Sequence, residues 1–418
     1  PGNSIVDSRS RLITDALSRI EDNALAADSL EEFASELGVS SRHLRRVFES
    51  EIGVSPVEYI QTQRLLAAKR LLTDTNMAVT QIALASGFGS VRRFNALFQE
   101  RYRLSPSELR KSRSGELAGQ SDTFTCSLTY RPPYDWESIL AFLRLRACPG
   151  IENVTDTAYS RTVSIDGTNG WLTVEQSPKT SCLTVTLSSS LAPKFLQVVN
   201  RLNRLFDLQA KPDLIETQLG KLARDFPGLR VPGAFDPFEV SIRGILGQQV
   251  SVKAATNLAG RLAKKYGAKI DTPIDELTLL SPTAGKLSKA TTEGISELGI
   301  VSTRANTIIN FAKAYEKGEL KLYPGADFDE TVKALTSLPG IGEWTADYIA
   351  MRCLAWPDAF PHGDLGIKKA LNKNHKKEIL AIAESYRPWR AYAAMHLWKS
   401  LDKLAPKAGS KGKKKLPS

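Results

Sequence analysis

One pattern of apolar and polar positions occurs twice within the first 110 residues. In each copy a stretch with helically spaced apolar residues ends at a glycine, a second such stretch begins at a serine, and a Ser-Pro pair follows. Apolar spacing of three and four residues, a glycine turn and a serine cap together predict a helix-turn-helix. The segments are 30–38, 40–48 and 54–56 in the first copy and 79–87, 90–98 and 104–106 in the second. Residues 56–72 predict one longer helix that joins the two copies.

The pattern changes after residues 113–122, whose polar, small and unpatterned side chains are typical of a linker. Beyond it, alternating apolar and polar positions rich in β-branched and aromatic residues predict strands. The expected strands are 124–130, 159–165, 170–175 and 181–187, with helices near 136–146 and 193–206. This segment therefore predicts a small antiparallel α+β unit.

Helical periodicity dominates from about residue 211 onward. The expected helices are 238–248, 252–266, 303–317, 328–337, 343–354, 367–371 and 376–384. The whole chain thus predicts a mainly α, multidomain fold, with domains at 1–112, 123–206 and 207–404. We expect the last segment, 405–418, to be a disordered basic tail, because it contains five lysines and no acidic residue.

Length and composition support this division. At 418 residues the chain is too long for one ordinary core, and its hydrophobic content of 42% argues against wholesale disorder. No apolar run approaches the roughly 20 residues that span a bilayer, so we expect a soluble, cytoplasmic protein with no membrane partner. Cys126, Cys148, Cys182 and Cys353 are far apart, which predicts reduced thiols and neither a zinc knuckle nor an iron–sulfur cluster.

The net charge of +11 adds information about partners. A basic protein suits a polyanion such as nucleic acid, because each neutralised phosphate releases condensed counterions. Ordinary solubility is the alternative explanation of the same charge. Residues 1–120 are nearly neutral, with 16 basic and 15 acidic residues, so DNA affinity there would depend on localised arginines.

Two short motifs carry the candidate chemistry. Residues 338–346 read Leu-Pro-Gly-Ile-Gly-Glu-Trp-Thr-Ala, where two glycines lie between the end of one expected helix and the start of the next. Such a turn exposes backbone N–H groups that can bind a phosphate, although a simple helix–helix corner would have the same sequence. About 20 residues later, Asp364 stands in the loop Pro-His-Gly-Asp, just before another expected helix. A helix N-cap is the ordinary role of an aspartate in that position.

The hairpin, the Asp364 loop and several further blocks resemble the helix-hairpin-helix DNA glycosylases, with most similarity to the DNA-3-methyladenine glycosylase II (AlkA) type. The resemblance extends from about residue 124 to 401 and includes the blocks 131–136, 204–209, 238–248, 298–300 and 388–392. It implies an all-α helix-hairpin-helix glycosylase domain after an α+β subdomain. It also implies an enzyme that flips an alkylated purine out of duplex DNA and breaks its N-glycosidic bond.

The resemblance assigns roles to particular residues. Asp364 would stabilise the oxocarbenium-like sugar or orient the attacking water. The base pocket would contain Phe142, Trp344, Tyr348 and Trp398, for which ordinary core packing is the alternative. The DNA backbone would contact Leu338, Gly340, Gly342 and Thr345, and Gln249 would be the wedge that fills the gap left by the flipped base.

Trp344 also bears on the reaction type. Bifunctional relatives have a lysine at the matching position, whose amine forms a Schiff base with the sugar. Tryptophan cannot do so, which implies a hydrolytic enzyme without lyase activity. Two residues depart from the AlkA pattern: Leu365 replaces an aromatic residue, and Gln249 replaces an apolar one. The resemblance implies no cofactor for catalysis, and a monovalent or divalent cation at the hairpin carbonyls is compatible with it.

The doubled helix-turn-helix resembles the AraC-type DNA-binding domain over residues 10–110. In that family the second helix of each unit enters a major groove. The expected DNA contacts are Arg42, Arg45, Arg46, Arg92, Arg93 and Asn95. A solvated charged face is the alternative for these residues.

The two resemblances together are similar to the Ada–AlkA fusions of bacterial adaptive responses to alkylation. They imply double-stranded DNA as partner, including promoter DNA at the helix-turn-helix units, and RNA polymerase as a further partner. They also lead us to expect an upstream methyl-accepting domain, which would hold the only zinc. A different hypothesis is a transcriptional activator whose glycosylase half binds DNA without catalysis.

Overall fold

The computed structural model describes residues 12–17, 19–20, 29–75, 77–111 and 122–404. The doubled helix-turn-helix is confirmed within them. Helices α2 (Leu30–Glu36) and α3 (Ser41–Ile52) form the first unit, and α5 (Val79–Ala85) and α6 (Val91–Tyr102) form the second. Helix α4 (Pro56–Asp74) joins them, and α7 (Pro106–Lys111) follows. Residues 113–121 of the expected linker and the expected tail, 405–418, lie outside the described residues.

Serine side chains define where these helices begin. Ser40 accepts a hydrogen bond from the backbone N–H of His43, and Ser90 accepts one from that of Arg93, so both second helices are capped as expected. The Ser-Pro pairs begin the next helix and do not simply end the previous one. Ser55 forms a capping box with Glu58 at the start of α4. Pro56 fits the first position of this helix, because a residue there needs no backbone N–H to form a helical hydrogen bond.

The α+β unit contains one five-stranded antiparallel sheet of order β1-β5-β4-β3-β2. The four expected strands are present as β1 (Thr123–Thr129), β3 (Ala158–Ile165), β4 (Thr168–Gln176) and β5 (Cys182–Ser188). A fifth strand, β2 (Glu152–Val154), was not expected from the sequence; it pairs with β3 along the sheet edge. Helices α8 (Trp136–Arg144) and α9 (Phe195–Leu205) and the 3-10 helix η1 (Ser189–Lys194) complete the unit.

The remaining described residues form short and medium-length helices. They are α10 (Pro212–Leu219), η2 (Gly220–Leu222), α11 (Pro237–Leu246), α12 (Val252–Tyr266), α13 (Ala284–Leu287), α14 (Thr292–Ser296), α15 (Ser302–Glu316), α16 (Phe328–Ser337), α17 (Glu343–Cys353), α18 (Leu365–Leu371), α19 (Lys376–Glu384) and α20 (Arg390–Leu404). Helices α11 to α17 enclose one apolar core, and α18 to α20 form a smaller one beside it. No helix among the described residues is long and apolar enough to cross a bilayer.

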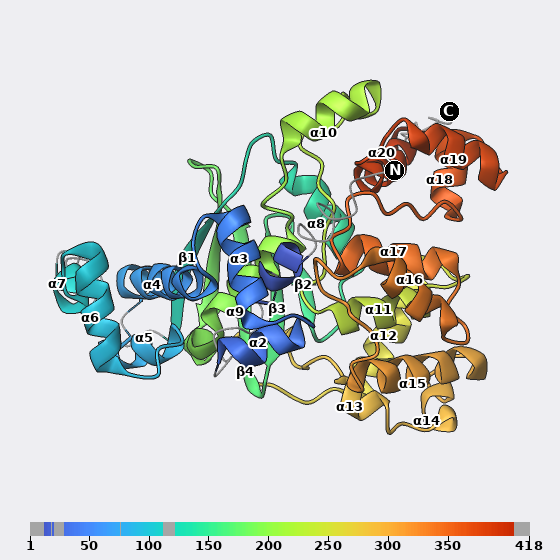
Figure 1. Cartoon of the computed structure of the whole chain (residues 1–418). Helices are drawn as coiled ribbons and strands as arrows, with labels where there is room; N and C mark the ends of the chain where they lie inside the picture. The colour runs from blue at the N-terminus through green and yellow to red at the C-terminus, as the bar shows by residue number, and fades with distance from the viewer. Residues whose placement is uncertain (1–11, 18, 21–28, 76, 112–121, 405–418) are drawn as a thin grey trace, which may run out of the picture.

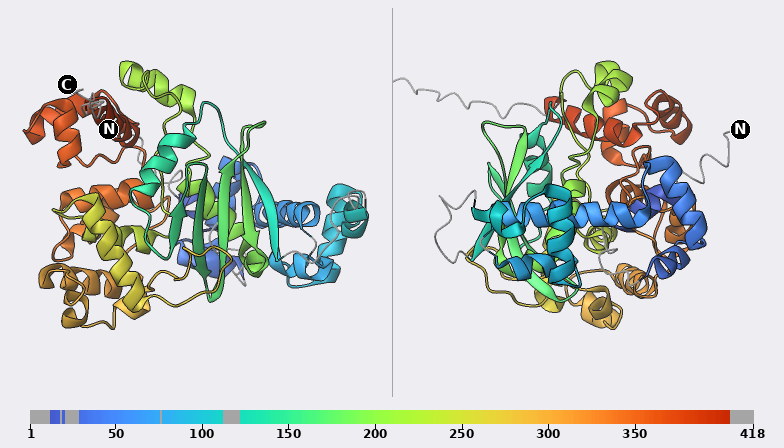
Figure 2. Two further views of the ribbon diagram at one scale, coloured as in Figure 1. Left: turned by 180° about the vertical axis from the view of Figure 1, so that it is seen from behind. Right: turned by 60° about the vertical axis from the view of Figure 1, so that its left-hand side comes forward.

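The helix-turn-helix units pack directly against the rest of the chain. In Figure 1 helices α4 to α7 extend to the left of the sheet, α2 and α3 lie in front of it, and α11 to α20 lie to the right, and Figure 2 shows the same arrangement from two other directions. Helix α4 contacts β1 and α5 contacts η1, and buried side chains from α4 to α6 belong to the same apolar cluster as those of the sheet. The second helix-turn-helix unit therefore shares a hydrophobic core with the α+β unit.

The first helix-turn-helix unit is connected to the helical region at another point. Arg19, in the helical segment before α2, donates a hydrogen bond from Nη2 to the Tyr323 hydroxyl at 2.9 Å. Its Nε forms an ion pair with Asp15 at 2.9 Å. Gly325 allows this approach, because a Cβ there would lie 2.9 Å from the backbone of Thr14. The two helix-turn-helix units thus contact both the sheet and the loop before α16.

Candidate active site and DNA-binding surfaces

Asp364 lies at the centre of a hydrogen-bonded cluster. Its Oδ1 accepts from the Trp398 indole N–H at 2.8 Å and from the backbone N–H of Ile367 at 3.1 Å. Its Oδ2 accepts from the Trp344 indole N–H at 3.2 Å. Asp364 is therefore the N-cap of α18, as the simpler interpretation expects, and it is also held by two tryptophans from α17 and α20.

Asp364 lines a cleft of about 1130 Å³ between the α+β unit and the helical region. The cleft brings together most of the residues expected at the site: Trp344, Tyr348, Trp398, Asp364, Gln249, Gly340, Gly342 and Thr345. The rings of Trp344 and Tyr348 are stacked, with centroids 5.5 Å apart. Leu365 also lines the cleft and is 80% exposed, so it leaves this wall open where an aromatic ring would close it.

Phe142 does not line this cleft, because Arg146 covers its ring. The Arg146 guanidinium lies 3.7 Å from the ring centroid, and that of Arg352 lies 4.9 Å away. Arg352 donates a hydrogen bond to the Tyr348 hydroxyl at 2.7 Å. Burial would raise the pKa of Tyr348, but the two guanidinium groups hold it below its ordinary value. Sequence reasoning missed both arginines, and the signal available was their spacing of four residues from Phe142 and Tyr348.

The hairpin between α16 and α17 packs closely on α15. Gly340 has a φ of +88°, and a Cβ at this position would lie 2.0 Å from the Thr307 hydroxyl oxygen. Gly342 ends the hairpin, where it is the N-cap of α17 without a capping side chain. The first backbone N–H groups of α17 therefore have no side-chain acceptor from the cap, as an anion-binding helix terminus requires.

The loop after α11 is fixed to this hairpin. Gln248 donates its side-chain N–H to the carbonyl of Gly340 at 2.8 Å and to the Thr345 hydroxyl at 2.9 Å. Arg304 of α15 donates to the Gln248 carbonyl at 2.5 Å. The next residue, Gln249, is exposed and has a φ of +57°, a conformation that costs a side chain of this type about 1 kcal/mol or more. The surrounding contacts thus hold the expected wedge residue in a strained position.

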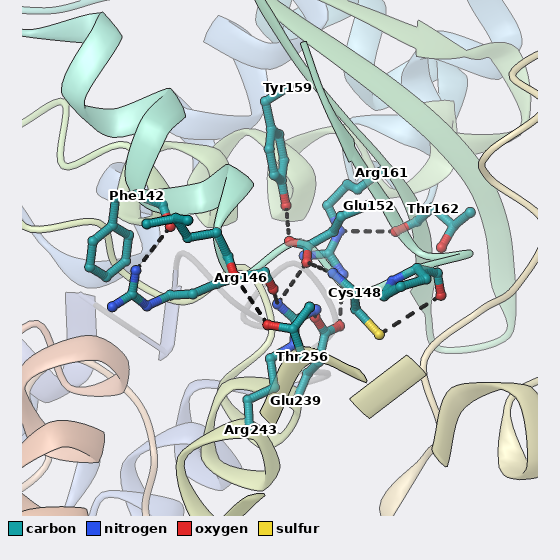
Figure 3. A network of polar contacts seen from close by, with 12 residues as sticks. Phe142, Arg146, Cys148, Glu152, Tyr159, Arg161, Thr162, Glu239, Arg243 and Thr256 are labelled. Atoms are coloured by element: carbon teal, nitrogen blue, oxygen red, sulfur yellow. Dashed lines mark hydrogen bonds and ion pairs between the residues drawn. The ribbon is translucent and has the colours of Figure 1, made fainter. Parts of the chain in front are cut away.

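A buried ionic network connects the sheet to α11 (Figure 3). Arg161 of β3 donates to Glu239 at 2.8 Å, and Arg243 contacts both Glu239 and, at 2.6 Å, Glu152 of β2. The Tyr159 hydroxyl donates to the second oxygen of Glu152 at 2.6 Å. Burial would raise the pKa of Glu239, but the two arginines outweigh it and lower that pKa below its ordinary value. The network fixes α11, and Gln248 and Gln249 lie in the loop that follows this helix.

The expected DNA-reading residues lie on the helix-turn-helix units and not in the cleft. Arg42, Arg45 and Arg46 are exposed on α3, and Arg92, Arg93 and Asn95 are exposed on α6. The packing of α4 and α5 on the α+β unit leaves these six side chains accessible. Within the described ranges, no group of three or more His, Cys, Asp or Glu residues could hold a metal ion.

The fold and cleft define a class of protein, and three family models match it. Residues 33–112 match a helix-turn-helix domain, 125–236 match the AlkA N-terminal domain, and 242–378 match the HhH-GPD superfamily base excision DNA repair protein. A 3-methyladenine DNA-glycosylase from Archaeoglobus fulgidus has the same fold over 68% of this chain and all of its own, with a TM-score of 0.59 at 22% identity. The class is an AraC-type reader joined to a helix-hairpin-helix DNA glycosylase.

Two relatives identify the family more narrowly. The probable bifunctional transcriptional activator/DNA repair enzyme AlkA of Mycobacterium tuberculosis is 32% identical over 96% of this chain and 83% of its own length. The DNA-3-methyladenine glycosylase 2 of Escherichia coli is 36% identical over 65% of this chain and 96% of its own length. The chain belongs to the family of bifunctional AlkA-type transcriptional activator/DNA repair proteins.

Proposed function

We propose that this chain excises alkylated purines of the 3-methyladenine type by hydrolysis, with Asp364 as its one catalytic carboxylate. The observation that carries the proposal is the position of Asp364 in the cleft, where two indole N–H groups and a backbone N–H orient its carboxylate. A fixed negative charge stabilises the positive charge that develops on the sugar as the base departs. The same carboxylate can orient the attacking water.

The aromatic walls of the cleft suit a flipped purine. Trp344, Tyr348 and Trp398 offer faces for an alkylated base, which is often cationic and is attracted to such faces. Arg146 and Arg352, which lie beside Phe142 and Tyr348, repel a cationic base. The attraction of such a base to the cleft therefore has to come from Trp344, Trp398 and the charge of Asp364. The exposed Leu365 leaves room for bases of different size.

The absence of lyase activity is a part of the proposal. Trp344 occupies the position where a lyase would need a primary amine, and an indole cannot form a Schiff base. The product would therefore be an intact strand with an abasic site. Borohydride should trap no covalent complex with DNA, and strand cleavage should require heating in alkali. Trapped enzyme would contradict this part of the proposal alone.

Asp364→Asn tests the central role of the carboxylate. Asparagine caps helices as well as aspartate does, so the variant keeps the hydrogen bond to Ile367 and loses the charge. Excision from methylated DNA, scored as abasic sites, should fall by about 100-fold or more. Asp327→Asn is the matched control, because Asp327 caps α16 outside the cleft. Equal inactivity of the unaltered protein and Asp364→Asn would favour a regulator with a catalytically inactive glycosylase half.

We also propose that the hairpin and the helix-turn-helix units bind different features of DNA. The hairpin, with Leu338, Gly340, Gly342 and Thr345, would hold the backbone near the lesion, with a cation at its carbonyls as a further possibility to test by metal titration. The arginines of α3 and α6 would read promoter DNA, and RNA polymerase would be a partner there. Replacing Arg45 and Arg92 with alanine should weaken promoter binding and reduce its salt dependence, while excision persists.

A further inference from the structure

The loop that carries Asp364 is fixed to α17 by one side chain that the catalytic proposal does not use. His362 lies two residues before Asp364, and its side chain is 14% exposed. Its Nε2 is 3.2 Å from a carboxylate oxygen of Glu343, and its Nδ1 is 3.5 Å from one of Asp347. Both acids belong to α17, the helix that also carries Trp344. Each ring nitrogen of His362 therefore faces a carboxylate.

The backbone leaves this loop little freedom of its own. The N–H of His362 donates to the Phe360 carbonyl at 2.7 Å, and the N–H of Asp364 donates to the Pro361 carbonyl at 2.8 Å. The turn is thus compact, and a shift of the His362 ring would move Asp364 with it. Glu343 is itself held from the other side by Lys376, whose Nζ lies 2.7 Å away. The Glu343 side chain links the hairpin end of α17, the Asp364 loop and α19.

The chemistry of imidazole makes this contact dependent on protonation. A neutral ring has one N–H and one lone pair, so it can donate to only one of the two carboxylates and presents a lone pair to the other. The imidazolium form donates from both nitrogens and carries a positive charge toward two acids. The charged groups around His362 are Glu343 and Asp347 on α17, Lys376 on α19 and Asp364 in its own loop. Three of these four groups are acidic, and two of them face the ring nitrogens of His362.

We propose that His362 is a positioning residue that, as the imidazolium, holds the Asp364 loop against α17. This inference rests on the proposed catalytic role of Asp364. Asp364 accepts from Trp344 at 3.2 Å and from Trp398 at 2.8 Å, so its orientation depends on how the loop sits between α17 and α20. Loss of the His362 proton weakens the contact of the loop with α17. The Asp364 carboxylate is then held mainly by its hydrogen bond to Trp398 of α20. Excision is therefore faster in the imidazolium form than in the neutral form, in which one ring nitrogen cannot donate.

The test is the pH profile of single-turnover excision on methylated duplex DNA. For the unaltered protein we expect the rate to fall about fivefold between pH 6 and pH 8.5. His362→Gln, which has one donor and no charge, should be about tenfold slower at pH 6 and should have a nearly flat profile. Asp347→Asn removes one of the two acids and keeps the histidine, so its profile should be shallower than that of the unaltered protein. His375→Gln, at an exposed histidine outside the cleft, is the matched control and should keep the full profile.

Binding and folding separate a positioning role from a structural one. The affinity of each variant for undamaged duplex should stay within about twofold of the unaltered protein, and its unfolding temperature should stay close. An unchanged pH profile in both His362→Gln and Asp347→Asn would overturn the inference, while inactivity of Asp364→Asn would leave the proposed function standing. If Asp364→Asn retains full activity, the proposed function fails first. If His362→Gln does not fold, Asp347→Asn decides the question.

Discussion

The Asp364 carboxylate caps a helix and is at the same time held by two tryptophans. Its Oδ1 caps α18 and also accepts from Trp398, while its Oδ2 accepts from Trp344. The sequence could present helix capping and catalysis only as alternatives, because spacing along the chain does not say which side chains from α17 and α20 meet there. Gly366 is part of the reason that they meet: a Cβ at this position would lie 2.9 Å from the Trp398 ring.

The residues that the sequence could not predict at the site are those placed by long-range packing. Arg146 covers Phe142 because the turn after α8 and helix α17 bring two guanidinium groups to one ring. The motif predicts an aromatic residue at position 142, and nothing in its spacing predicts which group lies on that aromatic face. The contribution of Phe142 to base binding therefore stays a prediction. For the Phe142 ring to contact a base, the Arg146 side chain has to move away from it; otherwise Arg146 itself faces the base.

His396 of α20 provides a prediction for stability against pH. It is 2% exposed, its Nδ1 has no hydrogen-bond partner among the described residues, and burial lowers its pKa to about 4. The unfolded chain binds this proton near the ordinary pKa of about 6.5, so the stabilisation is complete above that pH and is lost as the pH falls toward 4. Between pH 7 and pH 4 the unaltered protein should lose about 3 kcal/mol more unfolding free energy than His396→Gln.

Denaturant titrations at both pH values measure this difference. His375→Gln should lose as much as the unaltered protein, since His375 is exposed. Parallel pH dependence in His396→Gln and the unaltered protein would mean that folding does not change the pKa of His396.

At the scale of elements, strong periodicity gave good predictions. Helices at 252–266, 328–337 and 376–384 have the expected bounds, and four of the five strands were expected. The missed elements are short or lack a polar face. Strand β2 has three residues and depends on pairing with β3 and on the buried Glu152, which no local pattern reports. Helix α20 is buried continuously from 391 to 397, so it has no amphipathic period, although it carries Trp398.

The hairpin provides a prediction in which two glycines are compared. Gly340→Ala should destabilise the protein by about 1–3 kcal/mol, because the new Cβ would clash with Thr307 and the φ of +88° is unfavourable for alanine. Gly342→Ala should leave the unfolding temperature unchanged, because its φ is −94° and no atom lies within 4 Å of the added Cβ. Thermal unfolding of both variants checks the difference.

A second substitution makes the cause specific. Combining Gly340→Ala with Thr307→Ala should restore part of the lost stability, since the hydroxyl oxygen at 2.0 Å is then removed. Strictly additive effects of the two substitutions would show that the clash is not the source of the destabilisation.

At the scale of the whole molecule, the reader and the glycosylase form one packed body. The second helix-turn-helix unit shares its core with the sheet, and the first is connected to the loop before α16 through Arg19 and Tyr323. The sequence predicted two modules and a linker, because the periodicity of each module is complete in itself. It could not predict their packing, since the contacts between Arg19 and Tyr323 join residues 304 positions apart. The domain bounds of 1–112, 123–206 and 207–404 stay a proposal about how the chain divides.

Cleavage of the chain within 113–122 tests this packing. With a protease site introduced there, we expect the two pieces to remain associated and to co-elute in gel filtration after cutting. Arg19→Ala combined with Tyr323→Phe should weaken the association, because the hydrogen bond between the two side chains and the stacking of the Arg19 guanidinium over the Tyr323 ring are both lost. Arg42→Ala, on the exposed face of α3, should have no effect. Separation of the unaltered pieces on cutting would contradict the packed arrangement.

The shared core between α4, α5 and the sheet has a consequence for how such a fusion can arise. The Escherichia coli relative is matched over 96% of its length by only 65% of this chain. In this protein β1 and η1 contact the helices of the reader. In an enzyme that lacks the reader, the same surface of β1 and η1 has to be exposed to water. Joining the two genes would therefore not be enough, because the surface of β1 and η1 also has to become apolar to pack against the reader. If the reader were later lost, this surface would have to become polar again, since a large exposed apolar patch promotes aggregation. Transfer of the reader to another glycosylase would therefore require a matching apolar surface as well as a linker.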